Sequence, residues 1–279
     1  MRSFRPVILT SLAMVAFAGN SLLCRQALKY TTIDAASFTT LRIASGALML
    51  WLIVRLSRCA ASGDGNWASA FALFAYAAGF SFAYLTLTAA TGALLLFSAV
   101  QATMIGYGLW SGERLHGAQW IGLALALGGL VALLLPGLSA PPLFGTLLML
   151  GAGIAWGIYS LRGKGKGDPT RVTAGNFIRA VPIAVAMSLL ASSNLQPDVS
   201  GAIYALASGA LASGIGYAIW YTALPLLKPA SAATVQLSVP VIATLGGILF
   251  LGEPVTMRFM AASVAILSGI ALVILTRSK

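Results

Sequence analysis

The chain has 279 residues, of which 59% are hydrophobic and only 8% charged. This composition excludes an ordinary soluble domain and indicates a protein that crosses a membrane several times. The net charge of +11 would suggest a nucleic-acid partner in a soluble chain, but here Lys and Arg lie in short segments between apolar runs. We therefore expect no nucleic-acid partner, and the lipid bilayer as the surrounding medium.

Long stretches without charge predict the helices, taken in chain order. Residues 65 to 112 and 115 to 161 contain no Asp, Glu, Lys or Arg. Each stretch is about twice the ~20 residues that a helix needs to cross the hydrocarbon core, so each predicts two spans with an uncharged turn between them. In the first half the predicted spans are residues 6–28, 34–56, 67–88, 91–111 and 117–135. In the second half they are 142–161, 171–192, 201–223, 229–251 and 255–276.

The Lys and Arg residues outside the span interiors predict the orientation of these ten spans. One face carries twelve of them: Arg2, Arg5, Arg55, Arg58, Arg114, Arg162, Lys164, Lys166, Arg171, Lys228, Arg277 and Lys279. The other face carries three, Arg25, Lys29 and Arg258. Since positive residues accumulate on the cytoplasmic side, both termini are predicted to be cytoplasmic.

Two Gly-Glu dipeptides, Gly112-Glu113 and Gly252-Glu253, indicate that the chain is one unit written twice. Sliding the second half back by 140 residues also matches Ser98 with Ser238, Gly106 with Gly246 and Gly129 with Gly269. Earlier in each half an offset of 137 to 138 pairs Gly19 with Gly157, Arg42 with Arg179 and Tyr84 with Tyr221. The predicted fold is thus all-α, with a five-helix repeat in residues 1–137 and a second in residues 138–279.

Because each repeat holds an odd number of spans, the second copy must be inverted relative to the first. Inverted repeats are typical of secondary transporters, in which the two halves exchange conformations around a central site without ATP hydrolysis. The inversion places Glu113 at the cytoplasmic face and Glu253 at the outer face. We therefore interpret Gly112, Glu113, Gly252 and Glu253 as turn or gate residues rather than as substrate ligands.

Several short motifs resemble the drug/metabolite transporter superfamily, and more narrowly its ten-span, duplicated EamA-type exporters. They are Trp156-Gly157, Leu41-Arg42, Ile178-Arg179 and the stretch from Tyr221 through Pro229, Ala233 and Pro240 to Gly252-Glu253-Pro254. The resemblance covers the whole chain but is stronger in the second half, because Ala18-Gly19-Asn20 replaces the usual Trp-Gly in the first and no proline there matches Pro240. Among these exporters the chain is most similar to the aromatic amino acid exporters of the YddG type.

This resemblance implies an exporter of small organic metabolites in a bacterial inner membrane, with aromatic or other apolar amino acids as the expected substrates. The alternatives are an importer, a carrier of another solute class such as a nucleotide sugar or a drug-like cation, and a membrane-embedded enzyme. An enzyme would need a cluster of His, Asp or Glu near one interface, whereas this chain has a single His and dispersed carboxylates. We expect no catalytic site, no cofactor and no metal, and a monomer would suffice because the spans satisfy their own backbones.

Candidate substrate-binding residues are polar or aromatic side chains deep in the spans. The polar candidates are Asn20, Gln101, Asn176, Gln236 and Ser238, because polar groups are costly in a membrane unless they serve a site or bond to a neighbouring helix. The aromatic candidates are Tyr76, Tyr84, Trp156, Tyr217 and Trp220, which could line an amphipathic cavity or pack between helices. The resemblance favours the cavity for Trp156.

Two arginines lie within the predicted spans, and no acidic residue lies at mid-span. Arg42 and Arg179 each lie about nine residues into a span, on the order of 12 Å deep. They could receive a substrate carboxylate or bond the carbonyls of neighbouring helices, and their symmetric placement favours the structural role. Because no Asp or Glu lies at mid-span and His116 falls in a loop, facilitated diffusion or exchange is the expected mechanism rather than proton coupling.

Overall fold

A computed structural model describes residues 4–57, 64–112, 114–137, 140–163, 167–191, 198–227 and 229–277. All regular secondary structure in these residues is helical. Nine helices in this part of the chain are long and apolar enough to cross a membrane, and Trp67–Ala83 is a shorter apolar one. The prediction of a polytopic all-α membrane protein is therefore confirmed.

The helices follow the predicted spans closely. The first half contains α1 (Phe4–Tyr30), α2 (Ala35–Leu56), α3 (Trp67–Ala83), α4 (Ala89–Trp110) and α5 (Gly117–Leu134). The second half begins with α6 (Leu143–Arg162) and α7 (Pro169–Leu190). Its third span joins α8 (Val199–Ala207), the π-helix η2 (Ser208–Ile215), α9 (Gly216–Ala223) and the short 3-10 turn η3 (Leu224–Leu226). The chain then forms α10 (Pro229–Gln236), α11 (Ser238–Leu251) and α12 (Met257–Arg277).

Three of the predicted spans differ from the structure in detail. The span predicted over residues 67–88 ends as a helix at Ala83, and the side chain of Thr88 then caps the start of α4. The sequence hides this break because neither charge nor proline marks it. The eighth span contains the π-helix, and the ninth is divided at Leu237 into α10 and α11. Pro240 lies in the first turn of α11, where its missing N–H leaves no intrahelical hydrogen bond unmade.

Acidic residues mark the starts of several helices. Asp34, Asp168 and Asp198 accept hydrogen bonds from the backbone N–H groups of Ser37, Arg171 and Gly201, at 2.8, 2.8 and 3.0 Å. Each carboxylate thereby satisfies one of the free N–H groups in the first turn of its helix and complements the helix dipole. These three aspartates are thus structural caps at the ends of spans.

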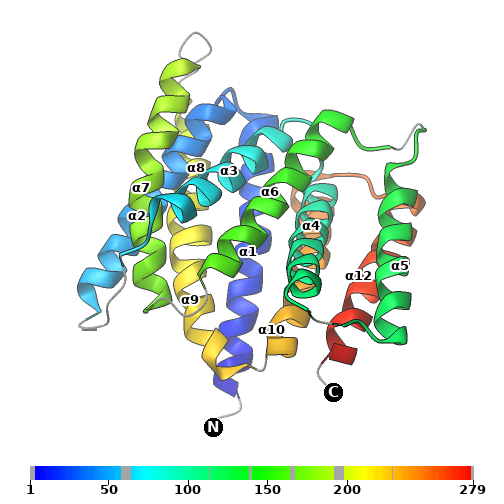
Figure 1. Cartoon of the computed structure of the whole chain (residues 1–279). Helices are drawn as coiled ribbons and strands as arrows, with labels where there is room; N and C mark the ends of the chain where they lie inside the picture. Colours follow the sequence, from blue (N-terminus) through cyan, green and yellow to red (C-terminus); the bar gives the residue numbers. More distant parts are fainter. Residues whose placement is uncertain are drawn as a thin grey trace.

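The main contacts between the two halves keep their pattern when the halves are exchanged. The first helix of each half packs on the third and fourth spans of the other: α1 on α8, η2, α9 and α11, and α6 on α3 and α4. The second spans, α2 and α7, pack on each other, as do the fourth spans, α4 and α11. The fifth spans, α5 and α12, form a pair at one side of the bundle (Figure 1). The division of the chain into two repeats, with a boundary at residue 137, stays a prediction.

The helix pair α5 and α12 is closely packed through glycines. A Cβ placed on Gly122 would lie 2.6 Å from the carbonyl oxygen of Gly269, and one on Gly269 would lie 2.5 Å from that of Gly122. Small residues of this kind let two helix backbones approach in a membrane.

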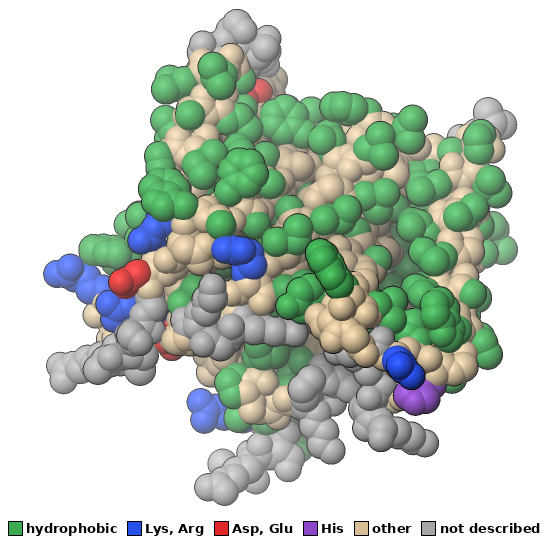
Figure 2. All heavy atoms as spheres, viewed as in Figure 1, with side chains coloured by type: hydrophobic (Ala, Val, Ile, Leu, Met, Phe, Trp, Pro, Cys, Tyr) green, Lys and Arg blue, Asp and Glu red, His purple; other side chains and the backbone are tan. Residues whose placement is uncertain are grey.

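The outer surface of the bundle is apolar, as a lipid-facing surface must be. Hydrophobic side chains cover most of the face seen in Figure 2, and the Lys, Arg and His side chains visible there lie from mid-height down, toward the end where α1 begins and α12 finishes. Large exposed side chains include Phe71 on α3, Trp120 on α5 and Leu249 on α11.

Candidate substrate site

A cavity lies at the centre of the bundle, between helices of both halves. Its lining residues are Phe17, Asn20, Tyr76, Phe80, Leu96, Phe97, Trp156, Ala212, Tyr217 and Gln236. The empty space among them, including the part that opens outward, is about 390 Å³, but it is narrow throughout and has room for little more than a water molecule. In this conformation the site is closed too tightly for a whole amino acid.

Aromatic rings form one wall of this cavity. The indole of Trp156 stacks on Tyr217, with ring centroids 5.2 Å apart and an interplanar angle of 26°, and on Tyr159 at 5.3 Å. Tyr76 tilts against the same indole at 4.8 Å, and Phe17 lies 5.6 Å from Tyr217. Since Tyr76 comes from α3, Trp156 from α6 and Tyr217 from α9, this wall joins the two halves.

A chain of hydrogen bonds forms the polar part of the cavity. The hydroxyl of Ser208, in the π-helix, donates to Asn20 Oδ1 at 2.6 Å. Asn20 Nδ2 then donates to the hydroxyl oxygen of Tyr76 at 3.4 Å, and Arg42 Nη2 donates to the same oxygen at 3.0 Å. Because the Tyr76 oxygen accepts from two donors, its own hydrogen points away from both.

Arg42 is a buried cation directly behind the cavity wall. Only 2% of its surface is exposed, and its guanidinium carbon lies 4.7 Å from the ring centre of Phe80 and 5.3 Å from that of Tyr76. Its Nη1 has no hydrogen-bond partner among the described residues. The two rings provide cation–π attraction, but no described carboxylate pairs with this charge.

Arg179, which the repeat aligns with Arg42, is bound quite differently. Its Nη1 donates to the carbonyl of Gly175 at 3.0 Å and to that of Asp64. Arg179 therefore has the structural role expected from the sequence, fixing the segment before α3 against α7. The symmetric placement of the two arginines does not extend to their partners.

The structure brings half of the predicted substrate-binding residues together. Asn20, Tyr76, Trp156, Tyr217 and Gln236 line the cavity. Tyr84, Gln101, Asn176, Trp220 and Ser238 are not among its lining residues. For all ten, substrate contact itself stays a prediction.

The five predicted residues that do not line the cavity contact other parts of the bundle. The Tyr84 hydroxyl donates to the carbonyl of Ala89 at 3.3 Å, and Ser238 donates to that of Val235 at 2.7 Å. Asn176 accepts from the backbone N–H of Asn66 at 2.8 Å and thus holds the start of α3. Trp220 packs against Phe17, and Gln101 is buried on α4 one turn after Phe97.

Sequence reasoning missed several lining residues, although helical spacing points to them. Phe17 lies three residues before Asn20, and Phe80 lies four after Tyr76. Residues three or four apart share one helix face, so each predicted residue marks a neighbour on the cavity side. Ala212, another lining residue, lies in the π-helix, which has no such signal in the sequence.

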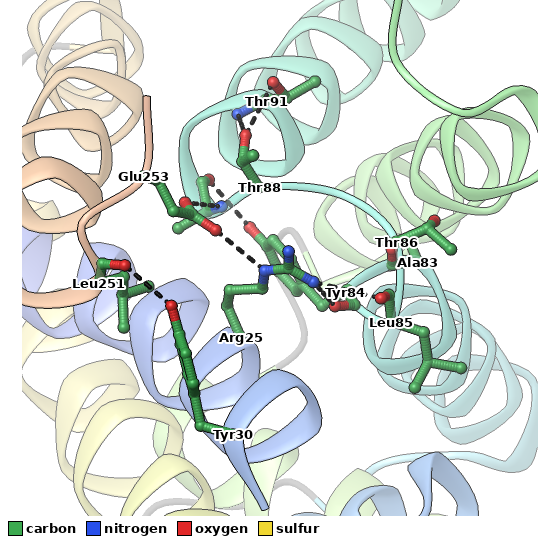
Figure 3. A network of polar contacts seen from close by, with 11 residues as sticks. Arg25, Tyr30, Ala83, Tyr84, Leu85, Thr86, Thr88, Thr91, Leu251 and Glu253 are labelled. Carbon is green, nitrogen blue, oxygen red and sulfur yellow. Dashed lines mark hydrogen bonds and ion pairs between the residues drawn. The ribbon is translucent and has the colours of Figure 1, made fainter. Parts of the chain in front are cut away.

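A buried ion pair lies toward one end of the bundle (Figure 3). Arg25 Nε lies 2.9 Å from Glu253 Oε1, and Arg25 Nη1 donates to the carbonyl of Tyr84 at 2.8 Å. Glu253 Oε2 accepts from the backbone N–H of Ala89, the first residue of α4, at 2.7 Å. Gly252, at φ +59° in the left-handed region, ends α11 and lets the chain turn so that Glu253 points inward.

This ion pair connects α1, the turn between α3 and α4, and the segment between α11 and α12. Arg25 follows Asn20 by five residues on α1, which is about 8 Å along the helix axis. The pair thus lies between the cavity and the end of the bundle opposite to the start of α1. Gly112, the other glycine of the two dipeptides, also has a positive φ of +91°, whereas Glu113 lies outside the described residues.

The chain is similar to known membrane transporters. The model of the EamA-like transporter family matches residues 143–275. An uncharacterized protein of Pseudomonas aeruginosa is 58% identical over 274 residues, covering 98% of this chain and 96% of that protein. The threonine/homoserine exporter RhtA of Escherichia coli K12 is 27% identical, covering 98% of this chain and 94% of its own.

Two further matches also cover most of the chain. An uncharacterized transporter of Archaeoglobus fulgidus is 26% identical, covering 88% of this chain and 89% of its own. A solved crystal structure that is 18% identical superposes with a TM-score of 0.67 over 97% of this chain and 96% of its own, which shows a shared fold.

Proposed function

Since the chain belongs to the EamA-like transporter family, we propose that it exports small organic metabolites, amino acids foremost, across the bacterial inner membrane. The observation that carries this proposal is the central cavity, because side chains of both halves converge there on an aromatic wall and a row of hydrogen-bond donors. Such a combination suits a solute with one apolar and one polar end.

The proposed mechanism is alternating access. The Arg25–Glu253 pair closes the path on the side away from the start of α1. Opening that side requires the pair to separate and α1 to move relative to the segment between α11 and α12. The exchangeable packing of the two halves supports this mechanism, because exchanging their conformations would close one side as the other opens.

The charge distribution supports an orientation with both termini in the cytoplasm, which would make the Arg25–Glu253 pair an outer gate. We propose facilitated diffusion or exchange as the energetics, because Glu253, the buried carboxylate of the described residues, is held in an ion pair rather than facing the cavity. Strictly pH-gradient-dependent accumulation in proteoliposomes would contradict this proposal.

Threonine and homoserine are the first substrates to test, because the full-length relative RhtA is named for their export. Phenylalanine and tryptophan follow, because the cavity wall is aromatic. Counterflow in proteoliposomes loaded with each amino acid tests them together. Saturable, exchange-accelerated uptake of at least one would support the proposal, and ohmic flux or no flux across the panel would contradict it.

Trp156→Ala tests whether the central cavity is the transport site. Removal of the indole deletes the common neighbour of Tyr76, Tyr159 and Tyr217, so we expect counterflow to fall by at least about tenfold. Trp120→Ala is the matched control, because Trp120 is exposed on the outer face of α5, and it should transport as the wild type does. Unchanged flux in a folded Trp156→Ala variant would remove this cavity from the transport path.

A further inference from the structure

Arg42 is a buried cation that has no counter-ion among the described residues. It is buried on α2, it donates to a tyrosine hydroxyl, and its Nη1 is unused among the described residues. A buried charge without a counter-ion is costly, and two aromatic rings and one hydroxyl offset that cost only in part.

The groups around the cavity side of Arg42 are mainly donors. Asn20 Nδ2 and Arg42 Nη2 both donate to the Tyr76 oxygen, so the Tyr76 hydrogen points away from both of them. Described carboxylates are all engaged away from Arg42: they are Asp34, Asp64, Asp168, Asp198 and Glu253. The polar part of the site is therefore positive and rich in N–H and O–H groups.

A purely structural arginine in this fold is bound differently, as Arg179 shows. The Arg179 guanidinium donates to two backbone carbonyls and fixes a loop. In contrast, the hydrogen bond of the Arg42 guanidinium goes to Tyr76, which itself lines the cavity, and Phe80 beneath it also lines the cavity. Arg42 is thus connected to the site through two of its walls.

We propose that Arg42, with Tyr76 and Asn20, binds the carboxylate of the transported solute. A carboxylate accepts from the Tyr76 hydroxyl and from the unused Nη1 of Arg42, and so supplies the counter-ion that the buried guanidinium lacks. The apolar part of the solute then lies against Trp156, Tyr217 and Phe17. This inference deepens the proposed function by naming the recognised group, and carboxylate binding can be tested without transport.

The test compares 3-phenylpropionate with its uncharged amide, 3-phenylpropionamide, on the purified protein in nanodiscs at constant ionic strength. Binding is followed by the rise of the melting temperature and by tryptophan fluorescence. We expect the wild type to bind the carboxylate at least about tenfold more tightly than the amide, as a charge-assisted hydrogen bond to arginine implies. Arg42→Gln should abolish this preference, and the control Arg179→Gln should keep it.

Two further variants keep the proposal testable if Arg42→Gln does not fold. Arg42→Lys retains the charge but loses the planar fork, and Tyr76→Phe removes the hydroxyl, so each should reduce the preference for the carboxylate. Equal binding of carboxylate and amide to the wild type would overturn the proposal, as would an unchanged preference in every folded Arg42 and Tyr76 variant. Counterflow failing while the carboxylate preference holds would count against the transport proposal alone.

Discussion

At the scale of single residues, the Arg25–Glu253 pair shows how a buried ion pair depends on both partners. Arg25 keeps the carbonyls of Tyr84 and Leu85 as acceptors when Glu253 is neutralised, whereas Glu253 keeps only the Ala89 N–H when Arg25 is removed. Arg25 therefore retains two hydrogen-bond acceptors without Glu253, whereas Glu253 retains one donor without Arg25.

Arg25→Ala should therefore destabilise the protein more than Glu253→Gln. The alanine variant leaves a buried carboxylate without its cation, a loss on the order of 3–5 kcal/mol, while glutamine still accepts from Ala89. Thermal unfolding of both variants in the same detergent measures the difference. Equal melting temperatures would show that the carboxylate does not depend on Arg25.

Asp198 gives a pH prediction outside the spans. Hydrogen bonds from the backbone of Thr32 and Gly201 lower the pKa of this carboxyl to about 2. Because the folded pKa lies below the usual value near 3.9, the stabilisation is present at neutral pH and is lost only as the pH falls toward about 2. Protection of the Thr32 and Gly201 amides from hydrogen exchange, corrected for the intrinsic rate, should be equal at pH 7 and pH 5. Asp198→Ala should lower it at both, and a loss of protection between pH 7 and 5 in the wild type would contradict the cap.

At the scale of helices, the α5–α12 pair depends on backbone contact. Gly122 faces the backbone of Gly269, whereas a Cβ on Gly128, on the same helix, would meet nothing within 4 Å. Both positions are glycine, but a Cβ at position 122 would meet the backbone of α12, whereas one at position 128 would meet open space.

Gly122→Ala should separate α5 from α12 and lower the melting temperature. Gly128→Ala should leave it unchanged or raise it slightly, since alanine is favoured over glycine in a helix by roughly 0.5–1 kcal/mol. Parallel thermal unfolding of the two variants decides the matter. If Gly122→Ala is as stable as Gly128→Ala, the close approach of the backbones contributes nothing to stability.

The sequence predicted elements better than it predicted their neighbours. Apolar runs about twenty residues long identify spans because a bilayer imposes that length. The aspartates that cap α2, α7 and α8 became evident only from the structure. Residue contacts are a different matter: Arg42 and Arg179 look alike in sequence, yet Arg42 donates to Tyr76 on α3, whereas Arg179 donates to Gly175 on its own helix and to Asp64, 115 positions away. The same holds for Arg25, which lies 228 positions before Glu253.

At the scale of the whole molecule, the proposed alternating-access mechanism requires the end of the bundle near the Arg25–Glu253 pair to open. Tyr30 at the end of α1 donates to the carbonyl of Leu251 at the end of α11, 2.9 Å away, on the same side as the Arg25–Glu253 pair. A link between these positions would hold the two helices together.

We therefore expect a flexible bis-maleimide crosslink between Tyr30→Cys and Leu251→Cys to stop counterflow. The background carries Cys24→Ala and Cys59→Ser, so that the introduced thiols are the reactive ones, and each single-cysteine variant treated with the reagent is the control. Full activity of the crosslinked double variant would show that this end of the bundle does not move during transport.

The π-helix Ser208–Ile215 has one more consequence. Its wider turns hold more residues per length of axis than an α-helix does. Its first residue, Ser208, and Tyr217, just after its end, contact residues that line the central cavity. Deleting one residue within it could be absorbed by a return to α spacing, leaving the Tyr217 ring facing Trp156. The same deletion in α6 ahead of Trp156 would rotate that ring by about 100°. The third span of the second half can therefore lose one residue and keep the position of Tyr217, whereas α6 cannot lose one ahead of Trp156 without rotating that ring.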